Sequence, residues 1–155
     1  MVRKLALAAT ALILFGVTGA IAGVLPPPPP AATSASTTTA FVGLNWVFGH
    51  GGQNVEGILG VANGHVSGGG DVTGAKAALH FRLTHGFALR KFKFTGLVGD
   101  TNAQFEGGLG FNFEDGNLFG VAGANGDYFA AGADVNFTGG LEAYIGAHSI
   151  GDFRD

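Results

Sequence analysis

The chain contains no cysteine in its 155 residues. This absence excludes a disulfide framework and any metal site built on thiolates. Charge is also scarce, because Asp, Glu, Lys and Arg together make up 12% of the residues, against roughly 25% in soluble domains. A soluble protein normally carries charge on its surface. The composition therefore favours a surface that faces lipid or that associates with itself.

Glycine and phenylalanine are abundant instead, with 29 Gly and 14 Phe. Disordered chains are poor in aromatic residues and rich in charge, so this composition indicates a folded chain. The length is that of one domain. The formal net charge is −3, and this acidic balance argues against nucleic acid as a partner.

Residues 1–22 have the organisation of a secretory signal peptide. Arg3 and Lys4 form a charged start, an apolar stretch follows, and Ala20-Ile21-Ala22 is a small-residue cleavage site. The alternative is an uncleaved membrane anchor, because the apolar stretch is close to the ~20 residues that a helical span needs. We expect an exported protein in the bacterial outer membrane, or alternatively in the periplasm or outside the cell.

Residues 23–39 form a predicted spacer between the signal peptide and the folded part. Five consecutive prolines at 26–30 predict a short polyproline II rod, and the Ala/Ser/Thr run that follows predicts a flexible segment. The barrel domain is predicted to cover residues 40–153.

From residue 40 onward, apolar and polar residues alternate between short breaks rich in Gly, Asn and Asp. Alternation is typical of β-strands with two different faces, and Asn-Gly or Asp-Gly breaks suit tight hairpin turns. Even spacing with short links predicts an all-β, antiparallel, up-and-down arrangement that closes into an eight-stranded transmembrane barrel. The predicted strands are 40–49, 54–63, 72–83, 87–98, 103–113, 117–124, 127–137 and 140–149.

One face of the predicted strands is apolar, and the other carries small residues and a balanced set of charges. In a soluble sandwich the apolar face would be the core, whereas in a small transmembrane barrel it would meet lipid. The barrel is favoured because an eight-stranded interior has room for small residues and a few paired charges. The charges predicted to form an interior network are Glu56, Lys76, Arg82, Lys91, Lys93, Glu106, Asp134 and Glu142.

Aromatic residues gather where the odd-numbered strands end. In a meander the odd strands run in the same direction, so these rings are predicted to lie at one rim of the barrel, as an aromatic girdle does at a membrane interface. The predicted rim consists of Trp46, Phe48, Phe81, Phe111, Phe113 and Phe137. Near this rim, Arg90 shares the apolar side of its strand and is predicted to point outward. Together with His85 of the preceding turn it is predicted to contact lipopolysaccharide phosphate, although Arg90 could equally reach the interface as a snorkelling side chain.

The order of signal peptide, spacer and eight alternating strands resembles the small bacterial outer-membrane barrels, the class of the OmpA transmembrane domain and of OmpX and Ail. The resemblance covers residues 40–153. It implies a monomeric membrane barrel without a continuous pore, surrounded by membrane lipid or lipopolysaccharide and assembled by the outer-membrane insertion machinery. Members of this class serve in envelope integrity, adhesion or host interaction, and a few are lipid A enzymes.

No residue pattern predicts a catalytic site, a metal site or a cofactor. The five histidines lack the spacing of zinc ligands, and glycine-rich segments such as 107–110 precede no predicted helix, unlike a phosphate-binding loop. We expect a non-enzymatic barrel with a structural or envelope-interaction role. The alternatives are a secreted soluble β-rich protein that binds a lipid or assembles into fibres, and a lipid-modifying outer-membrane enzyme.

Overall fold

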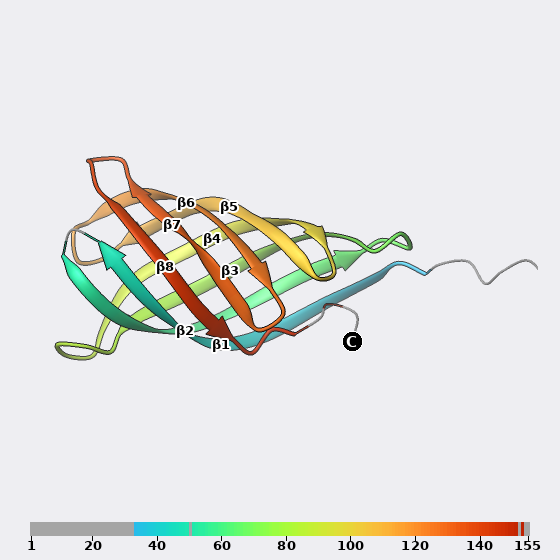
Figure 1. Ribbon diagram of the computed structural model, residues 1–155, viewed down its shortest axis with the longest axis horizontal. Helices are drawn as coiled ribbons and strands as arrows, with labels where there is room; N and C mark the ends of the chain where they lie inside the picture. The colour runs from blue at the N-terminus through green and yellow to red at the C-terminus, as the bar shows by residue number, and fades with distance from the viewer. Residues whose placement is uncertain (1–32, 50, 152, 154–155) are drawn as a thin grey trace, which may run out of the picture. The chain divides into compact units, whose positions relative to one another are not determined.

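The computed structural model describes residues 33–49, 51–151 and 153, which form one antiparallel β-barrel (Figure 1). Each strand pairs with its neighbour in sequence, and β1 pairs with β8, which closes the sheet. The predicted all-β, eight-stranded, up-and-down barrel is confirmed. The strands are β1 (Ala35–Gly49), β2 (Gly52–Val66), β3 (Asp71–Arg82), β4 (Ala88–Asp100), β5 (Ala103–Asn112), β6 (Asn117–Gly126), β7 (Phe129–Asn136) and β8 (Leu141–His148).

The predicted signal peptide and most of the predicted spacer lie outside the described residues. The end of the predicted spacer, however, belongs to the barrel sheet, because β1 begins at Ala35 rather than at residue 40. Its threonines pair with the end of β2, and the Asn63 amide donates a 2.8 Å hydrogen bond to the Thr38 hydroxyl. Thr is β-branched and favours extended backbone, so the polar run that looked like a linker continues the strand.

Side chains alternate between the two faces of the barrel wall, and the faces have opposite chemistry. Large apolar side chains of all strands but β3 are exposed on the outside, as Val42, Leu59, Phe94 and Leu109 illustrate. The inward positions hold the buried charged and amide side chains. The barrel therefore has the reverse polarity of a soluble β-protein, in which the apolar face forms the core. Among the described residues, no helix is long and apolar enough to cross a membrane.

Small residues on the inner face make room for large ones. A Cβ added at Gly60 would overlap the ring of Phe41, one at Gly110 would overlap Phe119, and one at Gly64 would overlap Phe153. An eight-stranded interior is only just wide enough for side chains, so each inward ring needs a neighbouring position with no side chain. This packing gives part of the high glycine content a structural reason.

The interior divides into two halves along the barrel. At the end that holds the turns 67–70, 101–102 and 127–128, the inner space is filled by apolar side chains, and we call this region the closed end. Phe153, which follows the last strand, contributes its ring to this packing and is 5% exposed. The closed end consists of Phe41, Ala62, Val66, Val72, Ala78, Leu97, Ile150 and Phe153.

Candidate functional site

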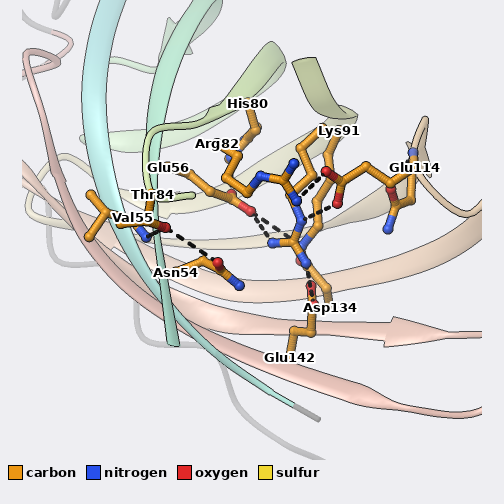
Figure 2. Close-up of polar contacts among 12 residues, drawn as sticks. Asn54, Val55, Glu56, His80, Arg82, Thr84, Lys91, Glu114, Asp134 and Glu142 are labelled. Carbon is orange, nitrogen blue, oxygen red and sulfur yellow. Dashed lines mark hydrogen bonds and ion pairs between the residues drawn. The ribbon is translucent and has the colours of Figure 1, made fainter. Parts of the chain in front are cut away.

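The opposite half of the interior, which we call the mouth, lies near the β1–β2 turn and the turns 83–87, 113–116 and 137–140. Two of these turns need positive φ angles, and glycine, which adopts them without strain, occupies those positions: Gly116 has a φ of 67° and Gly139 a φ of 102°. Charged side chains from five strands and one turn meet inside the mouth. Figure 2 shows Glu56, Glu114 and Glu142 converging from different sides of the barrel.

Glu56 of β2 is the most deeply buried carboxylate of the mouth, with 1% of its surface exposed. It accepts a hydrogen bond from Arg90 Nη1, and its second oxygen lies 3.0 Å from His80 Nδ1. The Lys91 ammonium is 3.8 Å from the same carboxylate. A buried carboxylate needs such partners, because an unpaired buried charge costs several kcal/mol.

Two lysines of β4 share one carboxylate on the far side of the barrel. Lys91 Nζ donates to Asp134 Oδ2 at 2.8 Å, and Lys93 Nζ donates to Asp134 Oδ1 at 2.6 Å. Lys91 also donates to Glu142. Lys93 lies 4.0 Å from the ring centroid of Tyr144, close enough for a cation–π interaction. These contacts join β4 to β7 and β8 through the barrel interior.

Glu114, in the β5–β6 turn, covers the network from the mouth. Its carboxylate accepts from Arg82 Nη1 at 2.6 Å and from Arg90 Nε at 3.3 Å. Its backbone N–H donates to Asn112 Oδ1 at 2.9 Å, and Asn112 Nδ2 donates to Asp115 at 2.8 Å. The side chains of Arg82 and Glu114 are each 29% exposed, so this pair borders the open space of the mouth.

A separate ion pair lies deeper in the barrel. Lys76 Nζ donates to Glu106 at 2.6 Å and to Asn125 Oδ1 at 3.0 Å. Glu106 also accepts from the Thr95 hydroxyl at 2.9 Å and from Asn125 Nδ2 at 2.6 Å. The carboxylate therefore has three donors, which compensate for its removal from water.

All eight charges predicted for the interior network face inward, and the structure brings them into the two groups just described. Sequence reasoning missed two members of the network. Glu114 was missed because it belongs to a turn, where alternation does not assign a face. Arg90 was missed for a different reason, and its predicted position is wrong.

Arg90 was predicted to point outward and to contact lipopolysaccharide. It is instead 6% exposed and pairs with Glu56, Glu114 and Glu142, the last at 2.5 Å. The cause is a β-bulge: His80 pairs with Lys91 and Phe81 pairs with Leu89, so Arg90 has no partner across β3 and shares the inner face with Lys91. The sequence held a signal, since the outward residues Leu89 and Phe92 are three positions apart, which strict alternation forbids.

The predicted aromatic rim lies near the mouth, where the odd strands end. Phe81 stacks against Phe87 with centroids 5.4 Å apart, and Phe111 meets Phe113 edge-on at 5.2 Å. His85 is exposed in the β3–β4 turn, where its φ of 62° is unusual for a residue other than glycine. Four rim side chains are exposed on the outer surface, namely Trp46, Phe48, Phe113 and Phe137.

A cavity of about 530 Å³ occupies the mouth above the ion pairs. Arg82, Lys91 and Glu114 line it, together with amide side chains from the strand ends. A second cavity deeper in the barrel, between the Lys76–Glu106 pair and Phe41, has a volume of about 20 Å³, which is space for roughly one water molecule. The mouth cavity is therefore a blind pocket, closed below by paired charges and then by the apolar closed end.

The part of the chain that the structure describes holds no group of three or more His, Asp or Glu side chains placed to bind a metal ion. His80 contacts Glu56, and His65 contacts the Ser36 hydroxyl at 2.8 Å; the predicted turn residue His50 lies outside the described residues. Comparison with known proteins gives no match to a family profile, to a curated protein or to a solved structure.

Proposed function

We propose that this protein is a non-enzymatic β-barrel of the bacterial outer membrane with a structural or envelope-interaction role. The observation that carries the proposal is the reversed polarity of the barrel. Phe94, Phe105 and Phe137 are 57–73% exposed on the outside, while Glu56, Lys91 and Asp134 are buried inside. Leaving apolar surface in water costs about 25 cal/mol per Å², and contact with lipid removes that cost.

The dimensions support a membrane as the surroundings. On the outer face of β5 and its following turn, Phe105 and Phe113 are eight residues apart, as are Phe129 and Phe137 around β7. At ~3.3 Å per residue and a tilt near 40°, each pair spans roughly 20 Å of height. This is close to the ~25 Å apolar band of transmembrane barrels.

The turns indicate which end would face outward. In bacterial barrels the turns on the periplasmic side are short and the external loops are longer. Besides the two-residue β1–β2 turn, the mouth has turns of five residues at 83–87 and of four residues at 113–116 and 137–140. The closed end has one four-residue turn at 67–70 and two-residue turns at 101–102 and 127–128. The mouth is therefore the end that we propose to face the cell exterior.

The filled interior favours a structural or binding role over transport. Ion pairs occupy the middle of the barrel, and the ring of Phe153 lies over Gly64 at the closed end. Conduction would require a water-filled path past both the ion pairs and the apolar closed end. A mouth that is open at one end only can hold a ligand but does not offer such a path.

The first test is cell fractionation of the full chain. We expect the protein in the outer-membrane fraction, with a folded band that migrates differently from the boiled band on a gel. A soluble pool in the periplasm or the medium would overturn the proposal and favour the secreted alternatives. Extracellular fibres that bind thioflavin would favour the fibre-forming alternative specifically, and altered lipid A on deletion of the gene would favour the enzyme.

The second test uses the single tryptophan of the chain. Trp46 is 49% exposed on the outer face near the mouth, so in vesicles with brominated lipids its fluorescence should be quenched. Acrylamide, which stays in water, should quench it weakly. Strong acrylamide quenching without bromine quenching would contradict lipid contact at the outer face.

A further inference from the structure

The mouth cavity has the dimensions of a ligand site. Its volume of about 530 Å³ lies within the roughly 300–1,000 Å³ of small-molecule pockets. Strands fix the side chains on its sides and floor, so the pocket is present before any ligand arrives. The lining includes Arg82, Arg90 and Lys91 from strands and Glu114 from the turn above them.

The arginine and lysine side chains that line this cavity already pair with carboxylates, and the carboxylate of Asp115 accepts a 2.8 Å hydrogen bond from Asn112 Nδ2. Arg82 pairs with Glu114, and Lys91 pairs with Asp134 and Glu142. Arg90 binds three carboxylates. A charged ligand would have to break one of these pairs and leave a partner buried without compensation, which is costly. The pocket therefore favours a ligand without net charge.

Amide groups at the cavity keep unused donors in fixed positions. Asn54 accepts from the Thr84 hydroxyl through Oδ1 at 3.3 Å, and Asn136 accepts from Thr138 N and Oγ1 at 3.3 and 3.0 Å. Their Nδ2 groups, and the amide of Gln53, have no partner among the described residues. All three residues line the cavity. Each asparagine is thus oriented by its oxygen and presents its nitrogen for another contact.

The cavity lining also contains acceptors. The carboxylates of Glu114 and Glu142 line the same cavity, and a carboxylate has more lone-pair sites than the contacts with Arg and Lys use. A hydroxyl group both donates and accepts a hydrogen bond. A molecule with several hydroxyls can therefore satisfy the amide donors and the carboxylate acceptors together without disturbing the ion pairs.

We propose that the mouth cavity is a binding site for a neutral, hydroxyl-rich ligand, namely one or two sugar residues held between the amides of Asn54 and Asn136 and the carboxylates of Glu114 and Glu142. The sugar could be free or could belong to a glycolipid at the cell surface, since both offer the same hydroxyl groups. This site does not depend on what surrounds the outer face of the barrel.

The test is a titration of the full chain, purified in an amine-oxide detergent so that no detergent sugar competes. Glucose and N-acetylglucosamine are the neutral probes, glucuronate is the charged analogue, and ligand-observed NMR measures binding. We expect saturable binding of a neutral sugar that changes little with ionic strength, and weaker binding of glucuronate. Asn54→Ala and Asn136→Ala should each weaken the affinity about 3- to 10-fold, as loss of one hydrogen bond does.

Asn63→Ala is the matched control, because it removes the same amide from the hairpin near the closed end. It should leave the affinity unchanged. Gel migration before and after boiling confirms that each variant is folded, and shifts of the Asn54 and Asn136 side-chain resonances in the unmodified protein report on the site without any substitution.

Three results would overturn the proposal: no saturable binding up to tens of millimolar neutral sugar, tighter binding of glucuronate than of glucose, or equal loss of affinity in the Asn63 control. The source of the sugar is tested by competition. Lipopolysaccharide with its core sugars should displace the probe if a glycolipid is the ligand, whereas a site for free sugar binds the probe equally well in its presence.

Discussion

The mouth and the closed end lie on the inner face of the same eight strands, but different kinds of side chain fill them. The mouth holds buried ions such as Glu56 and Lys91, each exposed by 1%, and it retains a cavity. The closed end holds Val72, Leu97 and Phe153 in apolar contact. Ion pairs need specific partners and leave space between them, whereas apolar side chains fill space with little directional demand.

This difference assigns different tasks to the two halves. Replacing a buried ion pair with well-packed apolar residues is often neutral or stabilising, so the mouth gains little stability from its charges. This supports the proposal that binding, rather than packing, accounts for the charged residues around the mouth cavity.

The largest expected effect comes from breaking the isolated buried pair. Glu106→Ala leaves the Lys76 ammonium, 9% exposed, without a carboxylate, and should lower the free energy of unfolding by about 3–5 kcal/mol. Urea unfolding in detergent micelles measures this. The double variant Lys76→Met/Glu106→Leu should recover most of the loss, because neither charge remains. If the double variant is as unstable as Glu106→Ala, the unpaired charge is not the cause.

The next effect tests the closed end. Gly64→Val places a side chain where the ring of Phe153 lies and should destabilise the barrel by about 1–3 kcal/mol through overpacking. Adding Phe153→Ala to this variant should relieve part of the cost. Gly51→Val is a control, because nothing lies within 4 Å of a Cβ at Gly51. An equal loss in the control would show that the ring is not responsible.

A smaller effect is expected at the bulge. Arg90→Lys keeps the charge but loses the planar fork that reaches Glu56, Glu114 and Glu142 at once. Loss of one or two charged hydrogen bonds should cost about 1–3 kcal/mol. Retention of full stability would mean that a point charge is sufficient at this position, contrary to the three-way contact.

The smallest effect belongs to the partly exposed pair. Glu114→Gln removes the charge that pairs with Arg82, where both side chains are 29% exposed. The amide oxygen of Gln can still accept from Arg90 Nε, which lies 3.3 Å from Glu114, so the change should cost about 1 kcal/mol or less. The same unfolding assay applies. If Glu114→Gln lowers the free energy of unfolding as much as Glu106→Ala does, ion pairs at the border of the cavity contribute as much stability as the fully buried pair, contrary to this expectation.

Particular residues show how far the sequence could be read. The alternation in 72–83 assigned Lys76 and Arg82 to the inside correctly, and the turn residues separated all eight strands. The errors lie where local rules change. Alternation gave the wrong face for Arg90 because a bulge adds one residue to β4. Composition gave the wrong start for β1, at Ala35, because a polar threonine run can form a strand. Glu114 could not be assigned to a face because it lies in a turn.

The sequence by itself determined the number of strands, their order and the chemistry of each face, because a period of two is a local property of extended backbone. Only the tertiary structure decided which ions pair, where the cavity lies and which end is filled by Phe153. Lys93 and Asp134 are 41 residues apart and meet across the interior. Such contacts depend on the closure and stagger of the whole barrel, which no single strand encodes.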